Sequence, residues 1–308
     1  MLSDNPTVER RNNGYEKMVP ELAMACAAIC VSLKRVEILE VRNLNTPSAE
    51  ERVLVSQGEH ATLLTLNRPD KLNPLDWATV RALLAAVDAL HLGDSPATVV
   101  ITGAGRAFSS GGDLRGYIDL YKDANQFGAF LEDFRRLLDR IESSDKVFIA
   151  AINGACVAGG LELILACDLV LASQSARIGD GHLNFGQLPG AGGSQRLPRA
   201  IGMLRAKHLM FTGDLISASD ACAIGLVGEV IPDDQLLLRA QDIAASLASR
   251  SAAGLRGMKR LVNEGMQQPR AQALRFEIDY VIDYATRCPD ATEGLLAFAE
   301  KRSPRYAR

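Results

Sequence analysis

The chain has 308 residues, 47% of them hydrophobic, which is enough for one large domain or two small ones with a full core. A formal net charge of −3 argues against a broad nucleic-acid surface, since binding nucleic acid requires many cationic side chains to neutralise phosphates. Six cysteines stand apart without a close Cys-x-x-Cys pair, so they suggest neither a structural zinc site nor a disulfide framework, and we expect a cytoplasmic protein.

Residues 1–50 differ from the rest of the chain. Their apolar stretch, residues 22–31, is shorter than the roughly 20 residues that span a bilayer, so we expect no membrane anchor. The residues before it mix Asp4, Glu9 and Glu16 with basic residues, which is untypical of a signal or transit peptide. We expect an N-terminal extension that is disordered or loosely docked, or an over-long start; a targeting segment is the alternative.

From residue 51 the hydrophobic pattern becomes regular. Alternating apolar residues predict strands over 52–55 and 61–66, joined by a turn at 57–59. Apolar residues at helical spacing then predict a helix over 76–90. Together these segments make one strand–strand–helix unit.

Strands and helices continue to alternate beyond this unit. Apolar runs predict buried strands over 98–102 and 147–152, with a helix over 125–142 between them. Further short strands are expected over 169–172 and 227–231. Such alternation indicates an α/β core.

The last third of the chain is mostly helical by the same criterion. Apolar stripes predict helices over 203–211, 217–225, 234–249, 253–265 and 270–285. We therefore divide the chain into the extension 1–50, the core 51–202 and a helical C-terminal region 203–308.

Two glycine-rich turns, at residues 107–113 and 157–162, are the most informative local feature. Each comes after a predicted buried strand. Two such turns can direct two backbone N–H groups at one oxygen, which is what a thioester carbonyl needs if it is to become an enolate. The second turn also carries a carboxylate, Glu162, beside this proposed oxygen site. The pair of turns therefore predicts an active site.

The first turn contains the run Phe-Ser-Ser-Gly-Gly-Asp-Leu, and the segments 153–163, 167–168 and 185–197 are similarly distinctive. Together with residues 221–227 and 298–302, they resemble the enoyl-CoA hydratase/isomerase (crotonase) family from about residue 51 to the C-terminus. The resemblance implies an α/β fold, a crotonase-like spiral of strand–strand–helix (ββα) units with a C-terminal helical trimerisation region.

The family resemblance also implies a substrate and a binding mode. The substrate would be an acyl-CoA thioester, and the protein would be a homotrimer or a dimer of trimers. No metal or redox cofactor is expected, since coenzyme A is part of the substrate. The backbone N–H groups of Gly112 and Gly159 would form the oxyanion hole. The residues expected along coenzyme A are Lys71, Leu72, Gly112, Asp113, Leu114 and Arg115.

Glu162 matches the first of two glutamates that hydratases of this family use. Its carboxylate would orient and deprotonate the water that attacks the β-carbon. A helix N-terminus favours its ionised form, whereas burial opposes it. The alternative is a glutamate that merely complements the helix dipole.

The second family glutamate is replaced here by His182. An imidazole titrates close to neutrality, so His182 can still donate a proton to the α-carbon of an enolate. A Glu–His pair would equally suit an enoyl-CoA isomerase, or a hydrolase of a thioester or β-diketone. The non-catalytic alternative is a histidine that fills space beside the pocket.

Asp180 and a set of five aromatic residues each have two possible interpretations. Asp180 is either an additional acid or part of a simple Gly-Asp-Gly turn. Five aromatic residues between the two glycine turns either shape an acyl pocket or pack the core: Tyr117, Tyr121, Phe127, Phe130 and Phe134.

From these observations we predict an enoyl-CoA hydratase of fatty acid metabolism that adds water reversibly to a 2-enoyl-CoA. Gly112 and Gly159 would hold the thioester oxygen, Glu162 would activate water, and His182 would supply the α-proton. The alternatives are the isomerase or hydrolase activities above and, from another class, a CoA- or RNA-binding protein with little turnover. The acidic net charge weakens the RNA-binding alternative.

Overall fold

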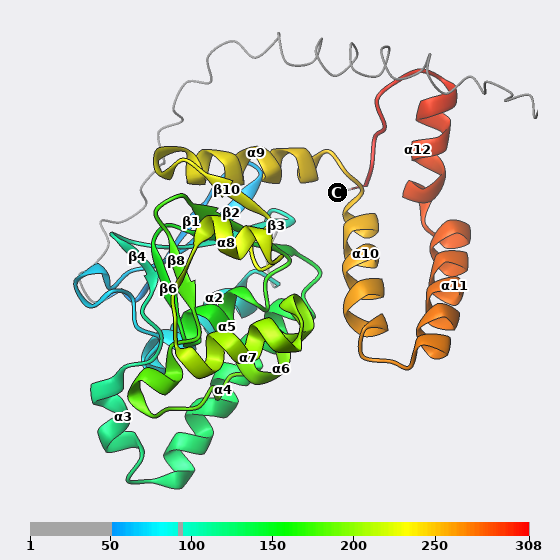
Figure 1. Cartoon of the computed structure of the whole chain (residues 1–308). Coiled ribbons are helices and arrows are strands. Elements are labelled where there is room, and N and C mark those ends of the chain that lie inside the picture. Colours follow the sequence, from blue (N-terminus) through cyan, green and yellow to red (C-terminus); the bar gives the residue numbers. More distant parts are fainter. Residues whose placement is uncertain (1–50, 92–94, 308) are drawn as a thin grey trace, which may run out of the picture. The chain divides into compact units, whose positions relative to one another are not determined.

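The structure, a computed structural model, describes residues 51–91 and 95–307. Strands and helices alternate along residues 53–231, and helices follow (Figure 1). The extension predicted over residues 1–50 lies outside the described residues. The division at residues 202/203 stays a prediction.

The larger sheet within the described residues has six strands in the order β1-β2-β3-β5-β7-β10. The first two strands are antiparallel and all other neighbours are parallel. Strands β3 and β5 are buried at every position, as expected where both faces of a parallel sheet are covered. The strands are β1 (Val53–Gln57), β2 (Ala61–Leu66), β3 (Thr98–Gly103), β5 (Val147–Ile152), β7 (Leu169–Ser173) and β10 (Glu229–Ile231).

A smaller sheet has four strands in the described part of the chain, in the order β4-β6-β8-β9. They are β4 (Ala107–Ser109), β6 (Ala155–Val157), β8 (Arg177–Gly179) and β9 (Ile216–Ser217). Apolar alternation does not predict these strands, because segments of two or three residues are too short to display it. The two glycine turns therefore follow β4 and β6, not the long strands directly.

The strands and helices repeat in one order. A long strand of the larger sheet leads to a short strand of the smaller sheet and then to a helix, as in β3-β4-α3, β5-β6-α5 and β7-β8-η2. This order confirms the predicted series of ββα units. The helices of this part are α2 (Trp77–Ala89), α3 (Leu114–Leu120), α4 (Ala124–Glu142), α5 (Gly159–Ile164), α6 (Gly193–Ile201), α7 (Met203–Thr212) and α8 (Ala218–Ala223), with short 3-10 helices η1 (Pro69–Lys71), η2 (His182–Phe185) and η3 (Asp233–Gln235).

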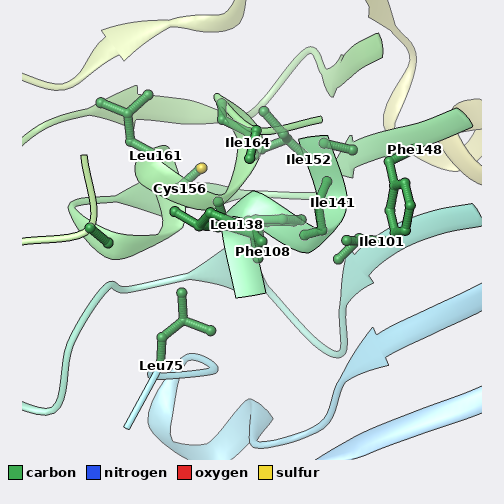
Figure 2. Packing of buried hydrophobic residues seen from close by; sticks show 14 of the residues in the cluster. Leu75, Ile101, Phe108, Leu138, Ile141, Phe148, Ile152, Cys156, Leu161 and Ile164 are labelled. Carbon is green, nitrogen blue, oxygen red and sulfur yellow. The ribbon is translucent and has the colours of Figure 1, made fainter. Parts of the chain in front are cut away.

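The hydrophobic core holds both short strands in place. Figure 2 shows Leu138 and Ile141 of α4 close to Phe108 of β4, with Cys156 of β6 nearby. All four residues belong to one cluster and are fully buried. The strands that end at the glycine turns are thus fixed by core packing, which leaves the turns themselves little freedom.

The C-terminal helices are α9 (Leu236–Ala248), α10 (Ala252–Gly265), α11 (Arg270–Arg287) and α12 (Pro289–Ala299). Helices α10 and α11 lie side by side and antiparallel (Figure 1). Apolar side chains of α11 are exposed at helical spacing, namely Leu274, Ile278, Val281 and Ile282. Across residues 51–91 and 95–307, every helix is too short or too polar to cross a bilayer.

A buried ion pair fastens α10 to the sheets. The Lys259 ammonium donates to the Asp168 carboxylate at 2.8 Å and to the backbone carbonyls of Ile141 and Lys146 at 2.8 and 2.9 Å. Asp168 also accepts the backbone N–H of Phe148 at 2.7 Å. Burial raises the pKa of Asp168, and Lys259 partly offsets that effect. One ammonium therefore joins α10 to the end of α4 and to β5.

Replacing Lys259 should destabilise the protein substantially. Lys259→Met leaves a buried carboxylate without its cation, so we expect a loss of about 3 kcal/mol in the free energy of unfolding. Urea unfolding measures this change. Arg260→Met is the matched control, since Arg260 pairs with Glu264 on the exposed face of the same helix and should cost less than about 1 kcal/mol. Equal losses in the two variants would contradict the anchoring role.

Candidate active site

The two glycine turns meet in space. Gly111 has φ of +89°, and a Cβ added there would lie 2.8 Å from the Cβ of Ala158 and 2.9 Å from the carbonyl oxygen of Val157. Ala158 itself has φ of +51°, an uncommon conformation for a residue with a side chain. The backbone of the first turn therefore rests directly on that of the second, and only glycine fits at the contact.

This contact brings Gly112 and Gly159 to the same pocket, which both residues line. Neither backbone N–H donates to another group within the described residues. The N–H of Gly111, in contrast, donates to the Ser109 hydroxyl at 3.1 Å. Two N–H groups at this pocket are thus available to an oxygen of a ligand; their role as an oxyanion hole stays a prediction.

The pocket opens to solvent and is lined mainly by apolar and aromatic side chains, with a few polar groups among them, as is typical of small-molecule sites. One side is formed by α3 and α4, the other by α5, η2 and the loop before α6. All five aromatic residues between the turns line it: Tyr117, Tyr121, Phe127, Phe130 and Phe134. Phe130 and Phe134 also belong to the core, so for these two residues lining the pocket and packing the core do not exclude each other.

The residues predicted to follow coenzyme A lie beside the first turn. The carbonyl of Leu72 accepts the N–H of Ser110 at 2.8 Å, which ties the end of η1 to the turn. Lys71 and Arg115 are exposed, and Leu114 lines the pocket. The Asp113 carboxylate accepts the N–H groups of Arg115 and Gly116 at 3.1 and 3.2 Å, so Asp113 caps α3.

Glu162 is buried at the pocket, with 2% of its surface exposed. Its Oε1 accepts the backbone N–H groups of Ala191 and Gly193, both at 2.8 Å. Its Oε2 lies 3.9 Å from Nε2 of His182. Burial raises the pKa of Glu162, although both N–H groups and His182 favour its ionised form. One oxygen is therefore held by the protein, while the other faces His182.

His182 lies between two carboxylates. Its Nδ1 is 3.0 Å from Oδ2 of Asp180, and its Nε2 faces Glu162. Burial disfavours the imidazolium, but the two carboxylates outweigh burial, so the pKa of His182 is raised. His182 stands at the position of the second family glutamate, and the structure places it next to Glu162, the first one.

Two features of the site carry little signal in the sequence. The N–H groups of Ala191 and Gly193 bind Glu162 from 29 and 31 positions away, a separation that leaves no local pattern. Asp180 was given two interpretations, an additional acid and a simple turn, and its exposed fraction of 1% shows that it does not lie in a solvent-exposed turn. Gly181, with φ of +65°, reverses the chain between the side chains of Asp180 and His182.

These groups allow a specific kind of chemistry. Two free N–H donors can stabilise an oxyanion where charge develops. A carboxylate and an imidazolium on the same pocket can accept one proton and donate another. The site is therefore suited to reactions that pass through an enolate and move two protons.

Comparisons with known proteins find relatives over most of the chain. Residues 57–308 match the family model described as enoyl-CoA hydratase/isomerase. The chain is 36% identical to a crotonyl-CoA hydratase of Syntrophomonas wolfei, with 84% of this chain and 98% of the relative covered. It is 33% identical to a short-chain-enoyl-CoA hydratase of Clostridium acetobutylicum, over 81% of this chain and 95% of that one. A crystal structure of enoyl-CoA hydratase from Bacillus anthracis superposes with a TM-score of 0.78 at 35% identity, covering 83% and 98% of the two chains.

Replacing Glu162 should change how stability depends on pH. Because its pKa is raised above the ordinary 4.5, Glu162 adds stability below pH 4.5 that is lost as pH rises through the folded-state pKa. Glu162→Gln removes this loss. The free energy of unfolding of the variant, relative to wild type, should therefore rise with pH, as urea unfolding between about pH 4 and pH 8 measures.

Asp133→Asn serves as a control of opposite sign. Hydrogen bonds from Trp77 and Arg81 lower the pKa of Asp133, so its contribution to stability is present above the unfolded pKa and lost as pH falls. The relative stability of this variant should fall as pH rises through the acid range. A Glu162→Gln curve parallel to that of wild type would refute the pKa assigned to Glu162.

Proposed function

Because the chain belongs to the enoyl-CoA hydratase/isomerase family, we propose that it is an enoyl-CoA hydratase, which adds water reversibly to a 2-enoyl-CoA thioester. The observation that carries this proposal is the convergence of two free N–H groups, a carboxylate and an imidazole on one pocket. Relatives named crotonyl-CoA hydratase and short-chain-enoyl-CoA hydratase support the same reaction.

The first step forms the enolate. The N–H groups of Gly112 and Gly159 hold the thioester oxygen and stabilise the charge that develops on it. Glu162 Oε2 takes a proton from water, and the water oxygen attacks the β-carbon. Oε1 stays bound to the two N–H groups before α6, so the accepting oxygen keeps its direction.

The second step completes the addition. His182, as the imidazolium, gives its Nε2 proton to the α-carbon, which yields the 3-hydroxyacyl-CoA. Glu162 then holds the proton from water, and His182 is neutral. Oε2 and Nε2 lie 3.9 Å apart, too far for direct transfer, so the proton returns from Oε2 to Nε2 through one water and restores both groups for the next turnover. Hydroxide on the β-carbon and a proton on the α-carbon sum to one water.

The substrate enters as an acyl-CoA, with its acyl chain among the aromatic side chains of α3 and α4. Coenzyme A lies along Lys71, Leu72 and residues 112–115 in this proposal. The steps above use only side chains and backbone groups of this chain, with coenzyme A as part of the substrate. Burial raises the pKa of Tyr117, so its hydroxyl stays neutral beside the acyl chain.

The assembly is a homotrimer or a dimer of trimers in this proposal, and the compartment is the cytoplasm. Support for assembly comes from α11, whose apolar stripe is exposed in the single chain. Helix α12 also exposes apolar side chains, including Leu295 and Phe298. Apolar patches of this kind are typical of protein interfaces.

Hydration should depend on both proposed proton carriers. Wild-type protein incubated with crotonyl-CoA should produce a CoA ester heavier by one water, measured by mass spectrometry. Glu162→Gln and His182→Ala should each lower the rate by about 100-fold or more, since positioned acids and bases contribute that much. His208→Ala is the matched control, because this histidine is exposed and outside the pocket.

An absence of water addition by wild type would overturn the hydratase assignment for this substrate. A longer 2-enoyl-CoA then separates a mismatch of acyl length from a different reaction. Assays for 3-enoyl isomerisation and for cleavage of thioesters or β-diketones cover the in-class alternatives, and tight CoA binding without turnover would indicate a binding protein.

The pH dependence of kcat/KM should be bell-shaped. Activity needs Glu162 ionised and His182 protonated, and both pKa values are raised. The rising limb should therefore lie above the ordinary glutamate value of 4.5, and the falling limb above the ordinary histidine value of 6.5. His182→Gln should abolish the falling limb. A limb that persists in this variant would assign the alkaline titration to another group.

A further inference from the structure

Asp180 is a buried carboxylate whose sole cationic partner within the described residues is His182. Its Oδ2 is 3.0 Å from Nδ1 of His182, and its Oδ1 accepts the backbone N–H of His182 at 3.3 Å. A buried carboxylate disfavours folding unless it is paired. Asp180 is therefore paired with His182 and does not lie in a solvent-exposed turn.

The backbone between the two residues fixes their relationship. Gly181 has φ of +65°, and a Cβ there would lie 2.7 Å from a methyl group of Val157. Val157 belongs to β6, which leads into the second glycine turn. The turn that pairs Asp180 with His182 is thus packed against the same strand that positions Gly159.

The chemistry of the two partners sets the position of the proton. Both Oδ2 of Asp180 and Nδ1 of His182 are buried and have no other partner within the described residues, and the contact between them is an ion pair at 3.0 Å that is not aligned as a hydrogen bond. A carboxylate can only accept, so its proximity favours a proton on Nδ1. After the imidazolium gives up one proton, the neutral ring keeps Nδ1–H and presents its lone pair at Nε2. Nε2 is the nitrogen that faces Glu162. Without Asp180 the opposite tautomer becomes accessible, and it cannot take a proton back at Nε2.

Other titratable groups around the pocket leave this assignment intact. Glu162 of α5 is the second carboxylate that acts on His182. Burial raises the pKa of both Tyr117 of α3 and Tyr121, which directly follows that helix, so both are neutral at pH 7. Arg196 of α6 binds the carboxylates of α4, Glu142 above all, at 2.6 Å.

We propose that Asp180 is a positioning residue for hydration: it holds His182 with Nδ1 protonated and Nε2 directed at the reacting carbon. The proposal rests on the proposed function of this site. It explains how a histidine can replace the second family glutamate, since the Asp180–His182 pair together supplies both the mobile proton and the negative charge of a carboxylate.

The direct test is the titration of His182 in histidine-labelled protein, followed by NMR. The chain has four histidines, and the His182 signals are identified by their loss in His182→Ala. Asp180→Asn should lower the midpoint of His182 and reduce the Nδ1–H tautomer of the neutral ring. An unchanged midpoint and tautomer would overturn the proposal. Asp180→Ser gives the same test if Asp180→Asn does not fold.

Kinetics provide the second test. Asp180→Asn should lower kcat for crotonyl-CoA by about 10-fold or more with KM within about twofold, and should move the falling limb of the pH profile to lower pH. In a His182→Ala background the same substitution should have no further effect. An equal loss in both backgrounds would mean a merely structural role and would overturn the proposal.

Asp214→Asn is the matched control, because Asp214 lies 3.9 Å from His208 on the exposed surface. The hydration rate of Asp214→Asn and the titration of His182 in this variant should match those of wild type.

The proposed function and the role of Asp180 are refuted by different results. A wild-type protein that does not hydrate 2-enoyl-CoA refutes the proposed function, whereas an unperturbed His182 in Asp180→Asn refutes the role of Asp180 even in an active hydratase.

Discussion

The close approach of two backbone turns is the constraint on which the rest of the site depends. Gly111 leaves no room for a side chain against Ala158 and Val157, and Ala158 adopts an uncommon positive φ. This local strain persists because β4 and β6, which lead into the turns, are held by fully buried residues such as Phe108 and Cys156. Core packing thus stabilises a geometry that neither turn would adopt alone.

Charge is then organised around that contact. Three ionisable side chains, Glu162, His182 and Asp180, lie in one row, with successive separations of 3.9 and 3.0 Å; the two carboxylates are buried and the imidazole is half-buried. Two carboxylates and one imidazolium carry a single net negative charge, which the N–H groups of Ala191 and Gly193 further offset. The row is polar enough to move protons and sufficiently neutral to remain buried.

Much of this organisation could be predicted from the sequence, and the exceptions have physical reasons. The long strands and helices follow from apolar periodicity, and the glycine turns from composition. Strands β4, β6 and β8 could not be predicted, because three residues are too few to show an alternating apolar pattern. The bond from Gly193 to Glu162 spans 31 positions, and hydrogen bonds at such separation leave no local trace. Asp180 stands in a Gly-Asp-Gly context that is typical of exposed turns, and only its burial distinguishes it.

The Ala191–Gly193 segment connects the wall of the pocket to Glu162. It follows Leu188 and Gly190, which line the pocket, and Gly190 packs against Leu131 so closely that an added Cβ would lie 2.6 Å away. Ala191 lines the pocket as well, and its N–H and that of Gly193 hold Oε1 of Glu162. One short stretch of backbone therefore defines both the surface that a ligand meets and the direction of the carboxylate beside it.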